Sequence, residues 1–183
     1  MFKKPYIDVD EWRDKPVRHR YVHGGFKGTD ARFSFYFPQK ERYQGRFFQH
    51  ITPAPGGENL EQHATGVEDQ ISFAIESGGY FIETNEGGPT AMMNPSVSGF
   101  RVNAAAAKYS RTVAAEMYGP HRTYGYAWGG KRRRLQDDKR IREYRRVGRC
   151  RAVCHRITAG HSQRFHSAHL CHASPVGQVS FDP

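Results

Sequence analysis

The sequence RTYGYAWGG, residues 122–130, joins a strand pattern to a turn pattern. Residues 124–128 are aromatic and apolar, which is typical of a short buried β-strand. Gly129 and Gly130 follow, and a glycine pair suits a sharp strand-to-helix turn in which backbone passes close to backbone. The next four residues, KRRR from Lys131, are all cations. We therefore predict a buried strand and the start of a tight turn, with a basic segment directly after it.

The chain before this stretch contains four further strand patterns. The first two are rich in aromatic and β-branched residues and flank the turn residues KGTD, which predicts an antiparallel hairpin. Alternation places Phe33, Phe35 and Phe37 on one face of the second hairpin strand. The predicted strands are residues 17–26, 31–37, 45–51 and 80–84.

Two helices are predicted between these strands. The apolar spacing in residues 68–77 favours a short helix, which a Gly-Gly pair ends. Asn103 is predicted to cap a helix over residues 104–118, which are rich in alanine and are followed by a Gly-Pro stop. Residues 85–95 are predicted to form a loop.

This order of elements predicts the fold class. A hairpin followed by strand, helix, strand, helix and strand favours an α/β fold with a mixed sheet that becomes parallel. We expect the strand at residues 124–128 to pair beside the strand at residues 80–84.

Charge divides the chain into two parts. Residues 1–130 hold 15 Lys and Arg against 14 Asp and Glu, a net charge of +1, and residues 131–183 hold 13 against 4, a net charge of +9. All three cysteines and five of the ten histidines also follow residue 130. We therefore predict an N-terminal extension at residues 1–16, a domain at residues 17–130 and a basic Arg/His/Cys-rich tail at residues 131–183.

The sequence shows no pattern for membrane insertion or export. It has no run of 18 or more apolar residues, which a transmembrane helix requires. The N-terminus, MFKKPYIDVDEW, lacks the apolar region of a signal peptide. We expect a cytoplasmic protein that does not contact a membrane.

Residues 17–130 resemble the N-terminal half of an α/β-hydrolase, of the kind found in the tannase and feruloyl-esterase-like serine hydrolases. The resemblance covers about 115 residues and depends more on the order of elements than on any one motif. The matching segments are YVHGGF with RFSFYFP, then FFQHITP, SGGYFIETN and NAAAAKYSRTVAAEMYG before YGYAWGG. The resemblance implies a partial α/β-hydrolase fold, a small ester as substrate of the intact family, and no cofactor.

The resemblance also assigns roles to single residues. In that fold a strand leads into the nucleophile elbow, G-x-S-x-G, so Gly129 and Gly130 form the elbow turn and Lys131 occupies the position of the serine. The loop after the third strand donates a backbone N–H to the oxyanion hole. Ile51 and Thr52 are the candidates, because the next residue is a proline, which has no N–H.

Two histidines near these segments are interpreted as structural. His50 stands directly before the oxyanion candidates, and we expect a strand-end histidine whose hydrogen bonds are satisfied by its neighbours. His23 lies in the hairpin and does not follow the third strand, so we expect no catalytic role for it.

The basic tail has two native interpretations. Its cations with interleaved aromatic residues suit nucleic-acid phosphates. Alternatively, the tail contains cysteine and histidine, which bind zinc, at Cys150, Cys154, His155 and Cys171. However, the spacing does not form two matched pairs of ligands, so we predict no metal site in the main interpretation. An unstructured native tail is the other possibility.

A third interpretation is that residues 131–183 are translated from the wrong frame of a GC-rich gene. Glycine and alanine codons that are displaced by one base become arginine and proline codons, and cysteine and histidine codons arise similarly. Back-translation from Lys131, read one base later, permits serine and then glycines, so that the elbow continues as GGSGG. Further along it permits the strand-like GAVPFVTGSP. On this interpretation the chain is the front half of a serine hydrolase, without its nucleophile and inactive.

Overall fold

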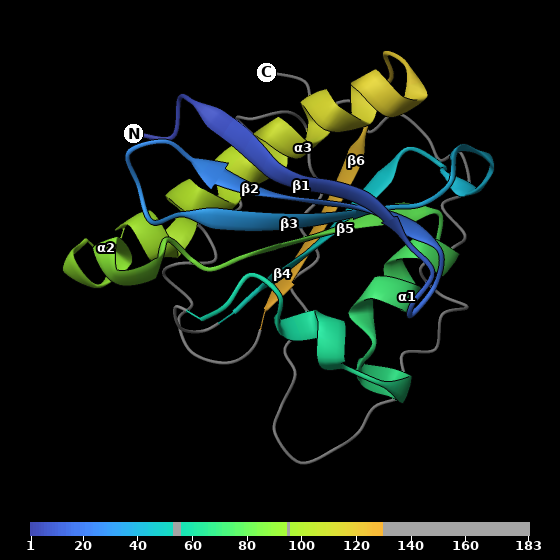
Figure 1. Cartoon of the computed structure of the whole chain (residues 1–183), viewed down its shortest axis with the longest axis horizontal. Helices are drawn as coiled ribbons and strands as arrows, with labels where there is room; N and C mark the ends of the chain where they lie inside the picture. The colour runs from blue at the N-terminus through green and yellow to red at the C-terminus, as the bar shows by residue number, and fades with distance from the viewer. Residues whose placement is uncertain (53–55, 95, 130–183) are drawn as a thin grey trace, which may run out of the picture.

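The computed structural model describes residues 1–52, 56–94 and 96–129, and within them the chain forms one six-stranded sheet with helices on both faces (Figure 1). The strands are β1 (Pro5–Arg13), β2 (His19–Phe26), β3 (Arg32–Phe37), β4 (Arg46–Ile51), β5 (Gly79–Thr84) and β6 (Tyr124–Gly129). The α-helices are α1 (Gln70–Glu76), α2 (Gly88–Met93) and α3 (Val102–Tyr118). Short helical turns are η1 (Lys40–Arg42), η2 (Leu60–His63), η3 (Gly66–Glu68) and the π-helical η4 (Val97–Arg101).

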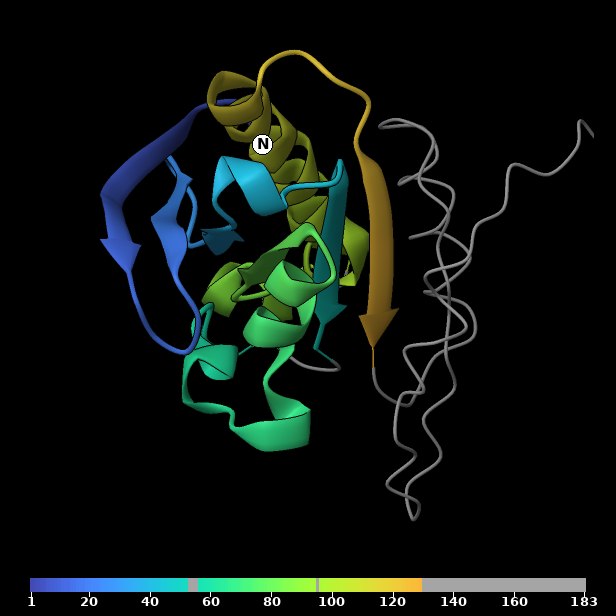
Figure 2. The same cartoon turned by 90° about the vertical axis from the view of Figure 1, so that its right-hand side faces the viewer.

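The strand order is β1-β2-β3-β5-β4-β6, and β1 and β6 therefore form the two edges of the sheet (Figure 2). The pairs β1–β2, β2–β3 and β3–β5 are antiparallel, whereas β4 is parallel to both β5 and β6. The mixed sheet and its hairpin are confirmed. The predicted neighbour of the last strand is wrong, because β6 pairs with β4 and not with β5. Both edges of β5 are already occupied, by β3 and β4, so the edge of β4 is the one that β6 can join.

β1 lies within residues 1–16, for which the sequence predicts only an extension. None of its nine residues is buried, so it lacks the apolar alternation that marks a strand with a covered face. Its backbone pairs with β2 from Pro5 to Arg13, and the Arg20 guanidinium bonds both oxygens of Asp10 at 2.6 and 2.7 Å. Its charged side chains are typical of an edge strand that resists pairing with other chains.

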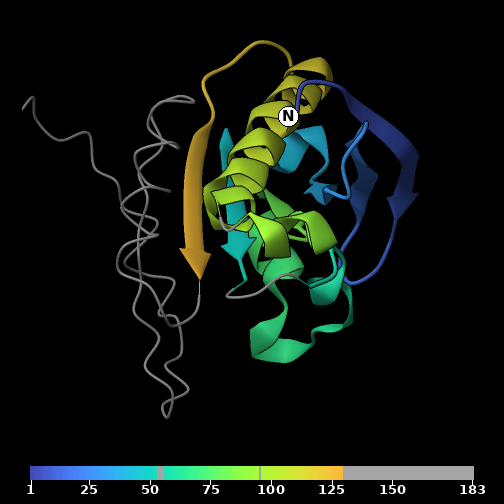
Figure 3. The same ribbon diagram turned by 90° about the vertical axis from the view of Figure 1, so that its left-hand side faces the viewer.

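One face of the sheet, called the α3 face below, is covered by α3 (Figure 3). An apolar core lies between this helix and the strands. The three phenylalanines predicted to share a face do so, and all are fully buried there. Small side chains on α3 allow the helix to approach the sheet closely. The contacts join Phe33, Phe35, Phe37, Phe47, Tyr80 and Ile82 of the strands to Val102, Ala106, Ala107, Val113 and Ala114 of α3.

The opposite face, called the α1 face, is covered by α1. This helix begins where the Asp69 carboxylate accepts the backbone N–H of Ser72 at 2.9 Å. It ends before Gly78, whose φ of 73° is the left-handed conformation that glycine adopts without strain. The helix predicted over residues 68–77 is therefore confirmed, and its buried side chains pack on Tyr21, Tyr36 and Phe81.

Two local predictions are wrong. Residues 85–95 were expected to be loop, but they contain α2, a six-residue helix with proline in its first turn. Asn103 was expected to cap the long helix from outside, but α3 begins at Val102 directly after η4, so Asn103 is a helical residue. Its side chain is fully buried and bonds to the sheet.

Candidate functional site

The strands β5, β4 and β6 are parallel, so their carboxyl ends lie together at one end of the sheet. The chain passes from β4 to β5 through α1 on one face, and from β5 to β6 through α3 on the other face. These opposite crossovers make the carboxyl end of β4 a topological switch point. Open α/β sheets bind their ligands at such a point.

The structure brings two of the predicted site residues together at this end of β4. Ile51, an oxyanion candidate, is the Cα partner of Gly129, the first elbow glycine, and His50 is the partner of Trp128. Thr52 directly follows the strand. The remaining predicted residues lie outside the described part of the chain, namely Gly130, Lys131, Cys150, Cys154, His155 and Cys171.

His50 has the carboxylate partner expected of a satisfied strand-end histidine. Its Nδ1 lies 2.9 Å from Oε1 of Glu61, a residue of η2. The histidine and glutamate side chains remain 25% and 12% exposed, respectively. The pair is therefore partly exposed, and it lies at the carboxyl end of β4 beside the last residues of β6.

A buried polar network lies under the same edge on the α3 face, and Asn103 is its centre. The Asn103 Oδ1 accepts from Gln49 Nε2 at 3.0 Å and from the Thr84 hydroxyl at 2.8 Å. Its Nδ2 donates to Glu86 Oε1 at 2.9 Å. The network thus joins β4, β5 and α3 directly behind the switch point.

The backbone after β5 has an unusual conformation. Glu86 has a φ of 56° although it carries a side chain, and it is almost completely buried. Gly87 follows with a φ of 93°, and a Cβ there would meet Cγ1 of Val97 at 2.8 Å. Left-handed conformations of residues other than glycine cluster at functional sites, where the surroundings hold them in place.

The α1 face carries a second polar cluster, centred on Glu83 of β5. The Tyr36 hydroxyl donates to Oε1 of Glu83 at 2.5 Å, and the backbone N–H of Glu61 donates to Oε2 at 3.2 Å. Burial raises the pKa of Glu83 to about 8, because it outweighs the hydrogen bonds from Tyr36 and from the Glu61 backbone, which lower the pKa. The carboxylates of Glu61 and Glu58 raise it further. Burial also raises the pKa of Tyr36 far above its ordinary value.

Residues 58–63, called the strap below, connect this cluster to four neighbouring strands. The Asn59 Oδ1 accepts from the hydroxyls of Tyr21 and Ser34, each at 2.7 Å. Gln62 donates to the Tyr36 hydroxyl at 3.1 Å. Glu61 bonds to β4 and β5, and Glu58 bonds to β2. The strap therefore crosses the sheet from β2 to β4.

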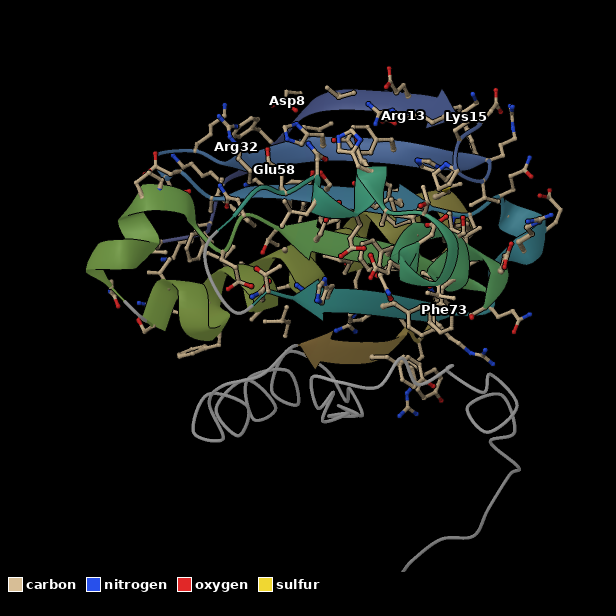
Figure 4. All side chains as sticks on the ribbon, turned by 90° about the horizontal axis from the view of Figure 1, so that it is seen from below. Asp8, Arg13, Lys15, Arg32, Glu58 and Phe73 are labelled. Carbon is tan, nitrogen blue, oxygen red and sulfur yellow. The ribbon has the colours of Figure 1, made fainter. Side chains whose placement is uncertain are left out.

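His23 connects the first residue of the strap to β2 and β1. Its Nδ1 lies 2.5 Å from Asp8 Oδ1 and its Nε2 lies 3.1 Å from Glu58 Oε1. Figure 4 shows Asp8, Arg32 and Glu58 on the same side of the sheet, and Arg32 lies 3.8 Å from Asp8. The hydrogen bond that His23 makes to the Glu58 carboxylate raises the pKa of His23 and lowers the pKa of Glu58. This arrangement agrees with a structural role for His23.

Reasoning from sequence missed Glu83, Asn103 and the strap. A signal was present for the first two: Glu83 is a charged residue directly after the apolar YFI segment of β5, and Asn103 stands directly before a run of four alanines. In the described ranges, no three His, Cys, Asp or Glu side chains group closely enough to hold a metal ion. Nor does any helix there have the length and apolarity to cross a membrane.

No protein-family model matches the chain, and no curated protein matches it. Among solved structures, the chain is similar to a tannin acyl hydrolase from Aspergillus niger, with a TM-score of 0.46 and 12% sequence identity. The similarity covers 69% of this chain and 27% of that chain. Likeness at this level identifies neither a family nor an activity.

Proposed function

We propose that the chain is the N-terminal part of an α/β-hydrolase-fold serine hydrolase that acts on carboxylic esters, and that it is inactive as written. The main supporting observation is the pairing of Gly129 with Ile51 at the carboxyl end of the parallel strands. In the proposed enzyme, the elbow and the oxyanion loop begin at these two residues. The hydrolase-like part is assigned to residues 17–130, after an extension at residues 1–16.

The pairing supports the proposal because acyl transfer needs its groups close together. The oxyanion hole combines one N–H from the residue after the nucleophile with one from the loop after the neighbouring strand. Adjacent strands lie about 4.8 Å apart. An elbow that begins at Gly129 would therefore place its nucleophile close to the N–H groups of Ile51 and Thr52.

The inactivity follows from Lys131 in the nucleophile position. A lysine attacks carbonyl groups only where burial or neighbouring cations lower its pKa, and it lacks the hydroxyl of a serine elbow. We propose that the frame changes after Gly130, and that the restored frame supplies serine there. Residues 131–183 then have no role in catalysis, in zinc binding or in nucleic-acid binding.

An ester-hydrolysis assay tests the proposal. The chain as written and a chain restored to the alternative frame after Gly130 are compared on p-nitrophenyl esters of short acids. We expect no turnover above a denatured control for the first chain, and turnover for the second. Serine-to-alanine replacement at the restored elbow is the matched control and should abolish the activity. Turnover by the chain as written, or none by the restored chain in folded form, would contradict the proposal.

A further inference from the structure

The strap is held on the sheet by polar contacts. None of its six residues is buried, and Leu60, its one apolar side chain, is 51% exposed. Each strap-to-strand contact described above is a hydrogen bond or an ion pair. A segment of this kind opens at a small free-energy cost, because its release exposes little apolar surface.

The strap also covers a carboxyl group that resists ionisation. Glu83 is only 4% exposed, and its two oxygens contact Tyr36 on one side and the strap backbone on the other. In the described part of the chain, the charged groups that act on it are the carboxylates of Glu61 and Glu58, both on the strap. Glu61 is paired in turn with His50 of β4, whereas α1 contributes buried apolar side chains on this face.

We propose that the strap is a pH-controlled lid over this end of the sheet, which closes on the protonated Glu83 carboxyl and opens when Glu83 loses its proton. An ionised Glu83 under a closed strap would be a buried charge next to two carboxylates of the same sign. Opening of the strap hydrates Glu83 and separates these charges. The proposal depends on the strap contacts and on the burial of Glu83 beneath them, and it holds whether or not the chain belongs to a hydrolase.

The direction of the pH effect follows from linkage. With the strap closed, the pKa of Glu83 is about 8, whereas a hydrated glutamate titrates near 4.5. Between these values the closed form holds a proton that the open form releases, so the open population rises with pH up to about 8 and then levels off. The raised pKa of His23 acts in the same direction above its ordinary value of 6.5, because a neutral His23 binds Glu58 less strongly.

Opening would separate Glu61 from His50 and uncover His50 at the end of β4. Glu61 bonds His50 through its side chain and Glu83 through its backbone, so release of the strap breaks both contacts together. The pH of the surroundings would thereby set the access of ligands to the switch point.

Native-state proteolysis of the full chain tests the lid. Cleavage by proteinase K within residues 58–63 is mapped by mass spectrometry from about pH 5 to about pH 9, and its rate is divided by that of a peptide with the strap sequence. When opening is fast, this ratio follows the open population. We expect the ratio to rise roughly tenfold or more between about pH 5 and pH 6.5, to rise further to about pH 8 and then to level off.

Two variants separate Glu83 from other causes. In Glu83→Gln, the ratio should change less than about twofold between about pH 5 and pH 6.5, since no proton is exchanged. The exposed Glu76 on α1 provides the matched control, and Glu76→Gln should follow the parent chain. If Glu83→Gln does not fold, Glu61→Gln replaces it and should give a smaller rise, because one facing carboxylate is removed. A ratio that is flat in the parent chain, or equal rises in the parent and Glu83→Gln or its replacement, would overturn the proposal.

Discussion

The α3 face of the sheet is covered by a helix through apolar contacts, whereas the strap covers part of the α1 face through hydrogen bonds and ion pairs. The phenylalanines of the α3 face do not ionise, and burial raises the pKa of Tyr80 packed among them well above its ordinary value, so the stabilising effect of this cluster does not depend on pH between about 5 and 9. The α1 face includes His19, Tyr36 and Glu83, each with a pKa shifted by burial. The difference indicates that one face provides stability and the other provides response to pH.

The largest effect is expected from removal of a core ring on the α3 face. Phe35 is fully buried and stacks on Phe33 with centroids 4.4 Å apart. Phe35→Ala should lower the free energy of unfolding by about 3–5 kcal/mol, equally at all pH values from about 5 to 9. Denaturant titrations measure this effect. Phe73→Ala, on the partly exposed side of α1, is the matched control and should cost about 1–2 kcal/mol. Equal losses would contradict the contrast between buried and partly exposed rings.

The polar centre of the α3 face is the next test. Asn103→Ala removes the partner of Gln49, Thr84 and Glu86, and we expect a loss of about 2–4 kcal/mol because buried groups are left unsatisfied. Asn94→Ala is the control, since Asn94 is exposed and its side chain bonds only Ser96 among the described residues; it should cost about 1 kcal/mol or less. Thermal or denaturant unfolding at one pH measures the loss of unfolding free energy in each variant. A loss at Asn103 no greater than that at Asn94 would show that the network contributes little.

The third prediction concerns global stability on the α1 face. Glu83 keeps its proton up to about pH 8 in the folded chain, whereas the unfolded chain loses it near pH 4.5. The stabilisation is therefore complete below about pH 4.5 and is lost as the pH rises to about 8, by at most about 1.4 kcal/mol per pH unit. Denaturant titrations of the parent chain minus those of Glu83→Gln should show this slope. A pH-independent difference would contradict the raised pKa.

The smallest effect is expected at His19, which acts in the opposite direction. Burial lowers the pKa of His19, and among the described residues its Nε2 has no hydrogen-bond partner. The unfolded chain therefore binds a proton below about pH 6.5 that the folded chain does not, so stability falls as the pH falls, by less than about 1.4 kcal/mol per pH unit. His19→Asn keeps a donor for the Val17 carbonyl but removes the titration. Its unfolding free energy should lose this acid-side slope, and an unchanged slope would contradict the assignment.

The contrast between the faces also explains what the sequence could predict. The alternation of Phe33, Phe35 and Phe37 predicts a buried face because apolar period is a local signal. β1 has no buried residue, so it gave no such signal, and its pairing depends on the backbone of β2. The position of β6 depends on which strand edge is free, which is a property of the assembled sheet.

The candidate site was also predictable only in part, namely in its strand ends and not in its polar contacts. The order of elements suggested that Ile51 and Gly129 belong to one site, and the sheet register places them side by side. The strap contacts could not be predicted, because they join residues 11 to 38 positions apart through polar groups without a periodic pattern. Lys131 lies outside the described residues, so its role as an interrupted nucleophile position stays a prediction.

Sequencing of the coding DNA across codons 128–134 and onward to the end of the tail decides whether the frame changes after Gly130. We predict that the frame one base later stays open from Lys131, encodes serine and glycines directly after Gly130, and continues through a segment such as GAVPFVTGSP. A stop codon early in that frame, or the absence of a serine codon directly after Gly130, would contradict it and would favour a native basic tail.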